Sequence, residues 1–364
     1  MTKILISGYY GFRNSGDDAI LDAMRTILAE RAPEAELTVL SYRPQETADD
    51  CHVRAVNRFG LLSVWRAVRG CDVLVSGGGS LLQDRTSTRS LLYYLSIIRL
   101  ARLCGKKTMV FANGIGPIAK PANRRRTRRV LAHVDRITVR EQASREELLA
   151  IGVEQPPPIV TADPVFASPG VDNHSARRLL SSEGIPTDRK LLAVALRPWP
   201  GMDSQAPLIA ELLDRVARDF DVSVVFMPMQ TPGDAKIGRK VKELMREQAY
   251  LMETAHTSAE WIGITGEMEL VLAMRLHALI FAAKRHVPTV GFIYDPKITA
   301  YLERLQMPAA GTIGALDVDA AYAAVAHTLQ NRAQCVETLR QKTEELADQA
   351  NENFTILLDL IRQG

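Results

Sequence analysis

The chain has 364 residues, more than a single hydrophobic core usually spans, so two domains are expected. It is 46% hydrophobic and 24% charged, which is ordinary for a globular protein and excludes a disordered or fibrous chain. The formal net charge of +3 is too small to indicate nucleic-acid binding by itself.

The four cysteines lie far apart and form no CxxC pair, which favours reduced thiols over a disulfide framework or a zinc site. The first residues lack the charged region, apolar stretch and cleavage site of a secretory signal. The longest apolar stretch, 90–105, contains two arginines and is too short to span a bilayer, so a buried helix is expected there. We therefore expect a cytoplasmic protein that needs no metal and no cofactor.

Strand-like runs alternate with helix-period segments along the first half of the chain. Continuous apolar runs separated by helices are typical of parallel strands that helices cover on both faces. A stretch rich in proline, glycine and serine, 164–189, interrupts the alternation and indicates a domain boundary. The expected strands are 3–7, 36–41, 72–77, 107–112, 136–140 and 158–162.

A second alternation follows the boundary, with expected strands at 190–198, 222–228, 270–275 and 288–294. The prediction is an α/β protein with two Rossmann-like domains facing a cleft, a GT-B-like architecture. A ligand is expected in that cleft, at the carboxyl ends of the strands. The expected parts are a first domain at 1–165, a linker region at 166–189, a second domain at 190–330, and a C-terminal helix within 331–364 that crosses back to the first domain.

Three polar, glycine-rich loops follow strands of the first domain. They are GYYGFRNSGDDAIL (8–21), GGGSLLQD (77–84) and NGIGP (113–117). Backbone N–H groups in such loops hold phosphates or carboxylates, although tight turns also use glycine. The GGGS loop lacks a complete dinucleotide or Walker pattern, so both interpretations stay open for it. Asp17 and Asp18 would also complement the dipole of the following helix.

Basic residues recur where strands end. Arg140 closes one strand of the first domain, and Arg197, Arg275 and Lys297 follow strands of the second. Each has an ordinary alternative as a solvated surface residue. Together they predict a pocket for a small, highly charged anion. His277 could be a satisfied core histidine, but its place at a strand-to-helix junction makes it the leading acid/base candidate.

The run RRRTRR, 124–129, has two interpretations. It is either a solvated helix face or a site of attraction to anionic lipid or a diphosphate-bearing substrate. Nucleic acid is not expected as a partner, because no interleaved aromatic residues or recognised binding motif accompany the run.

Seven motifs, in this order, resemble the polysaccharide pyruvyl transferase family, most closely its CsaB-type members. They are GYYGFRNSGDDAIL, DVLVSGGGSLLQD, FANGIGP, ITVRE, MPMQ, MRLHALIFAA and YDPK. The resemblance runs from about residue 3 to beyond residue 300.

The resemblance implies a GT-B-like fold that uses phosphoenolpyruvate in place of a nucleotide sugar. CsaB-type members form a 4,6-linked pyruvate ketal on the N-acetylmannosamine of a lipid-linked disaccharide and release phosphate. That disaccharide is a precursor of a secondary cell wall polymer, which later anchors surface-layer proteins. The implied place of work is the cytoplasmic side of the cell membrane, with reversible contact to its anionic surface.

The resemblance also implies roles for matched positions. His277 and Asp18 are the implied catalytic acid and base, with the order open, and many relatives carry Glu in place of Asp18. Asn14, Arg140 and Lys297 are implied to bind substrate. The glycine-rich loops and strand ends add further expected substrate-binding residues, namely Gly16, Gly78, Gly79, Asn113, Arg197 and Arg275.

Two other functions remain open on the sequence. One is a GT-B glycosyltransferase that uses a nucleotide-diphosphate sugar. Such a site needs partners for a base and a ribose, whereas the RLH and YDPK motifs offer compact positive charge. The other is a non-catalytic glycan-binding relative. The joint presence of Asp18, Arg140, His277 and Lys297 argues against it.

Overall fold

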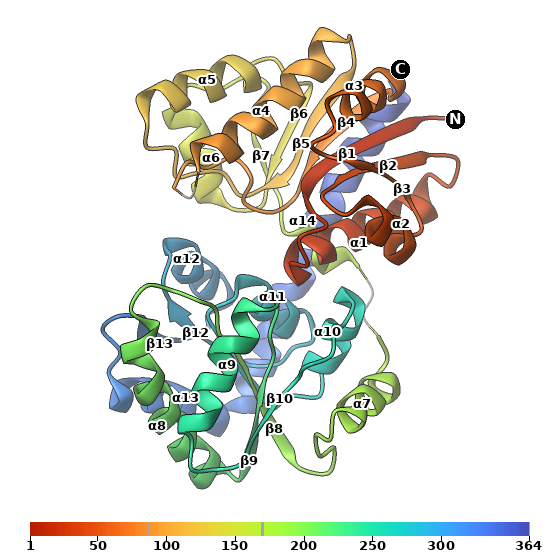
Figure 1. Ribbon diagram of the computed structural model, residues 1–364. Helices are drawn as coiled ribbons and strands as arrows, with labels where there is room; N and C mark the ends of the chain where they lie inside the picture. The colour runs from red at the N-terminus through yellow and green to blue at the C-terminus, as the bar shows by residue number, and fades with distance from the viewer. Residues whose placement is uncertain (86, 169–170, 364) are drawn as a thin grey trace. The chain divides into compact units, whose positions relative to one another are not determined.

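The computed structural model describes residues 1–85, 87–168 and 171–363, which form two compact α/β units (Figure 1). Unit 1 comprises Met1–Ser168 and Leu346–Gly364, and unit 2 comprises Pro169–Glu345. Each unit is built on one parallel sheet. The predicted α/β class with two Rossmann-like units is confirmed.

Among the described residues, the sheet of unit 1 has the strand order β3-β2-β1-β4-β5-β6-β7. Its strands are β1 (Lys3–Tyr10), β2 (Glu36–Ser41), β3 (Arg54–Asn57), β4 (Val73–Gly77), β5 (Lys107–Asn113), β6 (Arg136–Val139) and β7 (Ile159–Val160). Its helices are α1 (Ser15–Arg31), α2 (Pro44–Cys51), α3 (Leu61–Gly70), α4 (Thr88–Leu103), α5 (Pro121–Leu131), α6 (Gln142–Ala150) and the 3-10 turn η1 (Pro164–Ala167).

Helices cover both faces of this sheet. The helices α3 to α6 lie on one face, where they close a core with the strands (Figure 1). The other face carries α1, α2 and the end of α14 (Arg332–Arg362), whose Phe354 ring lies 5.2 Å from that of Phe111. The first core includes Leu5, Leu74, Val110 and Ile137 from strands, and Val64, Leu91, Leu131 and Leu148 from helices.

Unit 2 repeats the same winding. Its strand order, β10-β9-β8-β11-β12-β13, places the first strand of the unit in the middle of the sheet, as in unit 1. The strands are β8 (Lys190–Ala195), β9 (Val222–Phe226), β10 (Ala249–Leu251), β11 (Leu270–Ala273), β12 (Thr289–Ile293) and β13 (Ala309–Thr312). The helices are α7 (Asn173–Ser182), α8 (Met202–Phe220), α9 (Gly233–Leu244), α10 (Ser258–Thr265), α11 (Leu276–Lys284), α12 (Pro296–Leu305) and α13 (Val318–Gln330).

The central strands were expected from the sequence, whereas three edge strands, β3, β10 and β13, were not. Most of the residues in these three strands are not fully buried, so their sequences lack the apolar run of a central strand. The expected linker region, 166–189, contains α7, which buries Ala176 and Leu180 and packs on α10 in unit 2. The helix α14 contributes to both units, because the chain from Leu346 onward belongs to unit 1.

The beginning of α1 packs closely against two glycines that follow β4. Gly78 and Gly79 have φ of +57° and +72°, which other residues rarely adopt. A Cβ atom on Gly78 would lie 2.2 Å from Cγ2 of Ile20, and one on Gly79 would lie 2.4 Å from Oδ1 of Asp17. Both glycines are therefore required for α1 to pack against this loop.

We predict that Gly78→Ala destabilises unit 1 well beyond the cost of an unfavourable φ. Gly105 is the matched control, because its φ is +68° and a Cβ there would meet nothing within 4 Å. Gly105→Ala should cost about 1 kcal/mol, and Gly78→Ala should cost about 1–3 kcal/mol more, because Ile20 must move. Urea denaturation of both variants measures the difference. Equal losses of stability would contradict the close contact with α1.

Candidate active site

The opening loop places polar side chains at the start of α1. Asn14 is the N-cap residue, and its Oδ1 accepts a hydrogen bond of 3.1 Å from the backbone N–H of Gly16. Gly16 is buried in the first turn. In this structure, both residues that were expected to bind substrate shape the beginning of the helix.

Asp18 lies one residue beyond the buried Asp17 in the same turn. Burial raises the pKa of Asp18 to about 8, and the negative charges of Asp17 and Asp50 add to this effect. Its carboxyl group therefore carries a proton at neutral pH. A protonated carboxyl group at this position is suited to donate a proton, as a general acid does.

Asn113, an expected substrate-binding residue, makes a structural contact between two strands. It ends β5 with no exposed surface, and its Nδ2 donates a hydrogen bond of 2.9 Å to the carbonyl of Ser76 at the end of β4. The amide thus joins two neighbouring strands at their carboxyl ends. The expected role of Asn113 in substrate binding stays a prediction.

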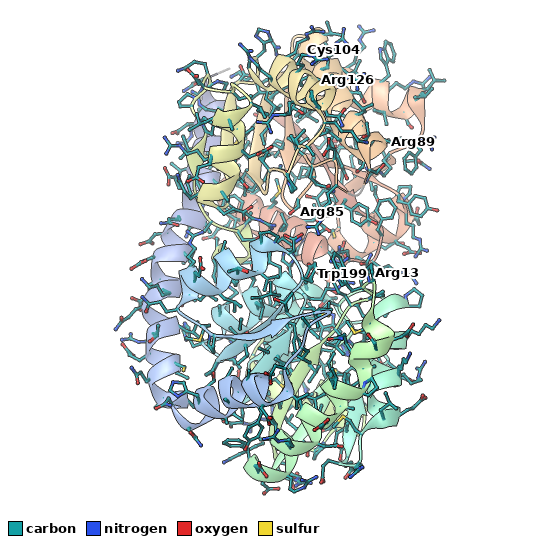
Figure 2. All side chains as sticks on the ribbon, turned by 90° about the vertical axis from the view of Figure 1, so that its left-hand side faces the viewer. Arg13, Arg85, Arg89, Cys104, Arg126 and Trp199 are labelled. Carbon is teal, nitrogen blue, oxygen red and sulfur yellow. The ribbon has the colours of Figure 1, made fainter. Side chains whose placement is uncertain are left out.

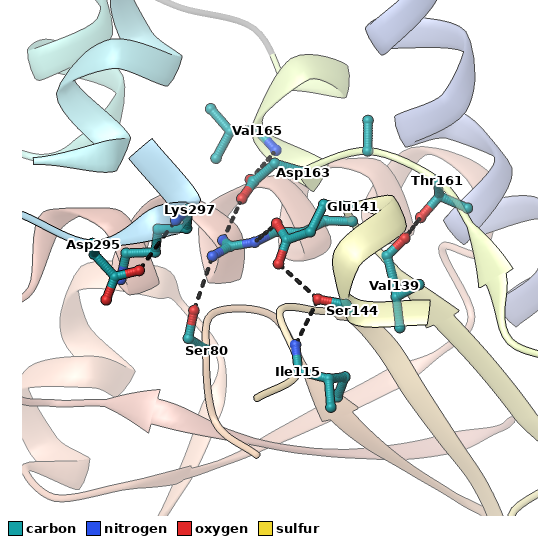
Figure 3. A network of polar contacts seen from close by, with 12 residues as sticks. Ser80, Ile115, Val139, Glu141, Ser144, Thr161, Asp163, Val165, Asp295 and Lys297 are labelled. Atoms are coloured by element: carbon teal, nitrogen blue, oxygen red, sulfur yellow. Dashed lines mark hydrogen bonds and ion pairs between the residues drawn. The ribbon is translucent and has the colours of Figure 1, made fainter. Parts of the chain in front are cut away.

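Arg140 is buried in a polar network at the end of β6. Its Nη1 donates to Oδ2 of Asp163 at 2.9 Å, its Nε to Oε2 of Glu141 at 3.2 Å, and its Nη2 to Oγ of Ser80 at 3.0 Å. Figure 3 shows how Ser144 extends this network, donating to Glu141 and accepting from the backbone N–H of Ile115.

Two carboxylates of this network pair with Arg140. Although burial opposes the charge, Glu141 and Asp163 raise the pKa of the Arg140 guanidinium above its ordinary value. Two carboxylates already neutralise this cation, and only 4% of its side chain is exposed. Arg140 is therefore placed to hold the Ser80 loop, and its expected role in substrate binding stays a prediction. Ser80, Glu141 and Asp163 were not among the expected site residues, although Asp163 directly follows an expected strand.

Unit 2 contains a different kind of basic cluster. Arg197, beyond β8, donates from Nη1 to the hydroxyl of Tyr294 at 3.0 Å, and its guanidinium carbon lies 4.9 Å from the centroid of that ring. Lys297, in the first turn of α12, places Nζ 5.7 Å from the same centroid. Neither cation forms a salt bridge with any residue that the structure describes.

Aromatic side chains organise this cluster. The ring of Trp199 lies 4.8 Å from that of Tyr294 and 5.5 Å from the Arg197 guanidinium carbon. Tyr294, the first residue of the YDPK motif, and Trp199 were not among the expected site residues. The available signal was an aromatic residue close in sequence to a basic residue that follows a strand.

Arg275 differs from these two cations because it is neutralised. Its Nε donates to Oδ2 of Asp234 at 2.9 Å, and its Nη2 donates to Oε1 of Gln230 at 3.1 Å. Burial raises the pKa of Asp234, and Arg275 opposes that rise. Of the three cations expected to bind substrate in this unit, Arg275 is thus paired with a carboxylate, whereas Arg197 and Lys297 form no salt bridge with a described residue.

His277 is the second residue of α11, directly after the neutralised Arg275. It is half-buried, with its ring centroid 6.2 Å from that of Phe281. The histidine therefore lies at the end of β11 where the sequence placed it, beside the strand ends that carry Arg197 and Tyr294.

Solved structures with a similar fold cover the whole chain. A UDP-N-acetylglucosamine 2-epimerase from Neisseria meningitidis has a TM-score of 0.67 at 10% identity, with 100% of both chains covered. A putative epimerase of the same name from Listeria monocytogenes has a TM-score of 0.67 at 12% identity, covering 100% of this chain and 97% of its own. A glycosyltransferase from Rickettsia africae has a TM-score of 0.64 at 9% identity, covering 100% and 99%. At such identities the likeness shows the fold alone, and it confirms the predicted GT-B-like class.

Sequence comparison gives the family. No curated protein matches the chain. The sequence model of the family described as polysaccharide pyruvyl transferase matches residues 14–296. This range begins within the opening loop, includes the Arg140 network together with Arg197, His277 and Tyr294, and ends one residue before Lys297. The resemblance carried by the ordered motifs is thereby confirmed, and the chain belongs to the polysaccharide pyruvyl transferase family.

Proposed function

We propose that this enzyme transfers the enolpyruvyl group of phosphoenolpyruvate to a cell-wall glycan precursor. In this proposal the product is a 4,6-linked pyruvate ketal, and phosphate is released. The acceptor is the N-acetylmannosamine of a lipid-linked disaccharide that leads to a secondary cell wall polymer and to surface-layer anchoring, as in CsaB-type enzymes. Membership of a pyruvyl transferase family supports the reaction class.

The observation that carries the donor assignment is the pair of cations on Tyr294. Phosphoenolpyruvate is small and presents a carboxylate and a phosphate, which require two cationic partners close together. Arg197 and Lys297 lie over one aromatic ring and form no salt bridge with a described residue, although the charge of Arg197 is near enough to act on Asp234. A guanidinium suits bidentate contact with either anionic group, and an ammonium adds a compact charge.

The proton requirements of ketal formation support roles for Asp18 and His277. The methylene carbon of phosphoenolpyruvate must gain a proton to become a methyl group, which leaves a cationic carbon for one sugar hydroxyl to attack. Phosphate then leaves with its bonding electrons, and the neighbouring hydroxyl closes the ketal. Each hydroxyl loses a proton as it bonds to carbon. The raised pKa of Asp18 favours it as the proton donor, and His277 is then the base that accepts a hydroxyl proton.

The direct test is incubation with phosphoenolpyruvate and a panel of lipid-linked and aryl disaccharides. We expect phosphate release together with a product that carries a pyruvyl ketal, detected by mass spectrometry. A folded His277→Gln variant should show no turnover. Consumption of a nucleotide-diphosphate sugar with no use of phosphoenolpyruvate would replace the proposal with the glycosyltransferase alternative. Acceptor binding without product from either donor would favour a non-catalytic relative.

We predict that Arg197→Gln and Lys297→Met each weaken phosphoenolpyruvate binding. Loss of one cation that pairs with a bound anion costs about 2 kcal/mol or more, which is about 30-fold in Kd. Isothermal titration calorimetry with phosphoenolpyruvate alone measures this effect without an acceptor.

Arg215→Gln is the matched control for these variants. Arg215 also lies over a tyrosine ring, 4.2 Å from that of Tyr322, but Asp319 neutralises it. Its loss should leave the Kd unchanged. Unchanged donor affinity in both Arg197→Gln and Lys297→Met would remove the Tyr294 cluster from the donor site.

We predict that the unfolding free energy of Asp18→Asn, measured relative to that of the parent protein, increases as the pH rises from about 4 to about 8. The folded-state pKa of Asp18 is raised to about 8, so folding disfavours its ionised form. The parent therefore loses stability across this interval, at up to about 1.4 kcal/mol per pH unit for one proton, and the loss stops above the folded-state pKa. Urea denaturation at several pH values gives the difference in unfolding free energy.

Asp188→Asn serves as the control for this series, because Asp188 is exposed in unit 2. Its stability difference from the parent should stay flat between pH 5 and 8. A flat difference for Asp18→Asn as well would mean that Asp18 ionises near the usual pKa of an aspartate, and the acid role would lose its support.

A further inference from the structure

Arginine is concentrated on three consecutive helices of unit 1. There are two arginines on α3, three on α4 and five on α5, and these helices contain no aspartate or glutamate. The chain as a whole has 45 basic and 42 acidic residues, so the remainder of the protein has more acidic than basic side chains. The positive charge is thus collected in one region.

Topology places these helices on one face of the sheet. Side chains from α3, α4 and α5 share the same hydrophobic core, so their other sides face outward together (Figure 1). Figure 2 labels Arg89 at the start of α4 and Arg126 on α5, both exposed at the surface of unit 1. We call the outward side of α3, α4 and α5 the arginine face.

Most of these cations are not neutralised within the protein. Among the described residues, Arg124 pairs with Glu147 at 3.2 Å, and the other nine arginines of the face have no carboxylate partner. In unit 2, by contrast, Arg177, Arg215 and Arg239 each pair with an acidic side chain. The arginine face is therefore complementary to an extended anionic surface.

Exposed apolar residues lie next to the arginines of α3. Phe59 precedes α3, and Leu61, Leu62 and Trp65 occupy its first turns. Leu61 is 88% exposed and Leu62 is 70% exposed. The Trp65 ring lies 5.0 Å from the Arg69 guanidinium carbon, so apolar and basic groups are in contact. We call these four residues the apolar tip.

We propose that the arginine face and the apolar tip dock the enzyme on an anionic lipid bilayer. Leu61 and Leu62 enter the boundary between headgroups and acyl chains, Trp65 lies at headgroup level, and the arginines contact lipid phosphates. Each basic residue near such a surface strengthens binding about fivefold. No described helix is long and apolar enough to cross a membrane, so the contact is interfacial.

The leucines distinguish this partner from a nucleic acid. Phosphate backbones attract arginine, and bases stack on aromatic rings, but neither gains from two neighbouring aliphatic side chains in water. Hydrocarbon at a membrane surface does gain from them, because their apolar area leaves water. The combination therefore favours a bilayer.

The apolar tip is continuous with the opening loop. The Phe59 ring lies 6.0 Å from that of Tyr42, which stacks at 4.8 Å on Phe12, two residues before Asn14. The guanidinium of buried Arg58 lies 5.2 Å from the Phe12 ring and 5.5 Å from the Phe59 ring. Docking through this tip would hold a lipid-anchored acceptor close to the loop that carries Asp18. This last step rests on the proposed function, whereas the docking itself does not.

The experiment measures binding of the full chain to vesicles, with no reaction involved. The probes are vesicles of phosphatidylglycerol and phosphatidylcholine in equal parts and vesicles of phosphatidylcholine alone. The parent should sediment with the anionic vesicles and should be released by high salt. Leu61→Ser/Leu62→Ser should lower the partition coefficient about tenfold or more. Arg66→Gln/Arg69→Gln/Arg99→Gln/Arg102→Gln should lower it at least tenfold and should flatten the salt dependence.

Matched controls come from unit 2. Leu244→Ser removes an exposed leucine, and Lys236→Gln/Lys242→Gln/Arg246→Gln removes three exposed cations from the same region. Both should bind vesicles as the parent does. Binding that survives the leucine variant, or that falls equally in the controls, would overturn the proposal. Duplex DNA that binds the parent as tightly as the anionic vesicles and displaces it from them would identify the face as a nucleic-acid site.

A parallel assay separates this proposal from the proposed function. The leucine and arginine variants should retain parental turnover of phosphoenolpyruvate with a short, water-soluble disaccharide. If neither the parent protein nor the variants use phosphoenolpyruvate, the proposed function is wrong. The vesicle experiment still tests whether the arginine face and the apolar tip bind a bilayer.

Discussion

The close packing of α1 against the loop after β4 determines the arrangement of the candidate site in unit 1. Ile20 and Asp17 occupy the space that side chains on Gly78 and Gly79 would fill. The first turn of α1 is partly buried by this contact. Burial, together with the negative charge of Asp17, raises the pKa of Asp18. Gly78 and Gly79 belong to a loop whose sequence resembles a ligand-binding loop. In this structure they allow α1 to pack closely, and they affect the pKa of Asp18 only through that packing.

The arginines of this protein differ in whether a carboxylate pairs with them. Arg140 and Arg275 are held by buried carboxylates, Asp163 and Asp234, so they order the loops around them at little net charge. Arg197 and Lys297 lie over the Tyr294 ring and form no salt bridge with a residue that the structure describes. The same distinction applies to the arginine face, where nine arginines have no carboxylate partner among the described residues and lie near exposed leucines.

Much of the fold could be predicted because its central strands are long, apolar and separated by amphipathic helices. The segments around β1, β4, β8 and β11 are buried on both faces and are therefore continuous apolar runs. Edge strands such as β3 bury little, so their sequences carry no comparable signal. The strand ends also located Asp18, His277 and Lys297, because parallel strands bring their following loops to one edge of each sheet.

The sequence by itself determined the α/β class, the positions of the central strands and, through its ordered motifs, the family. Local patterns suffice for these properties, since hydrophobic period and motif order are both written along the chain. Only the tertiary structure decided which basic residues are paired with carboxylates. Asp163 lies 23 residues from Arg140, and Asp234 lies 41 residues from Arg275, so neither pairing has a local signal. The same holds for the arginine face, because only the winding of the sheet brings α3, α4 and α5 to one side.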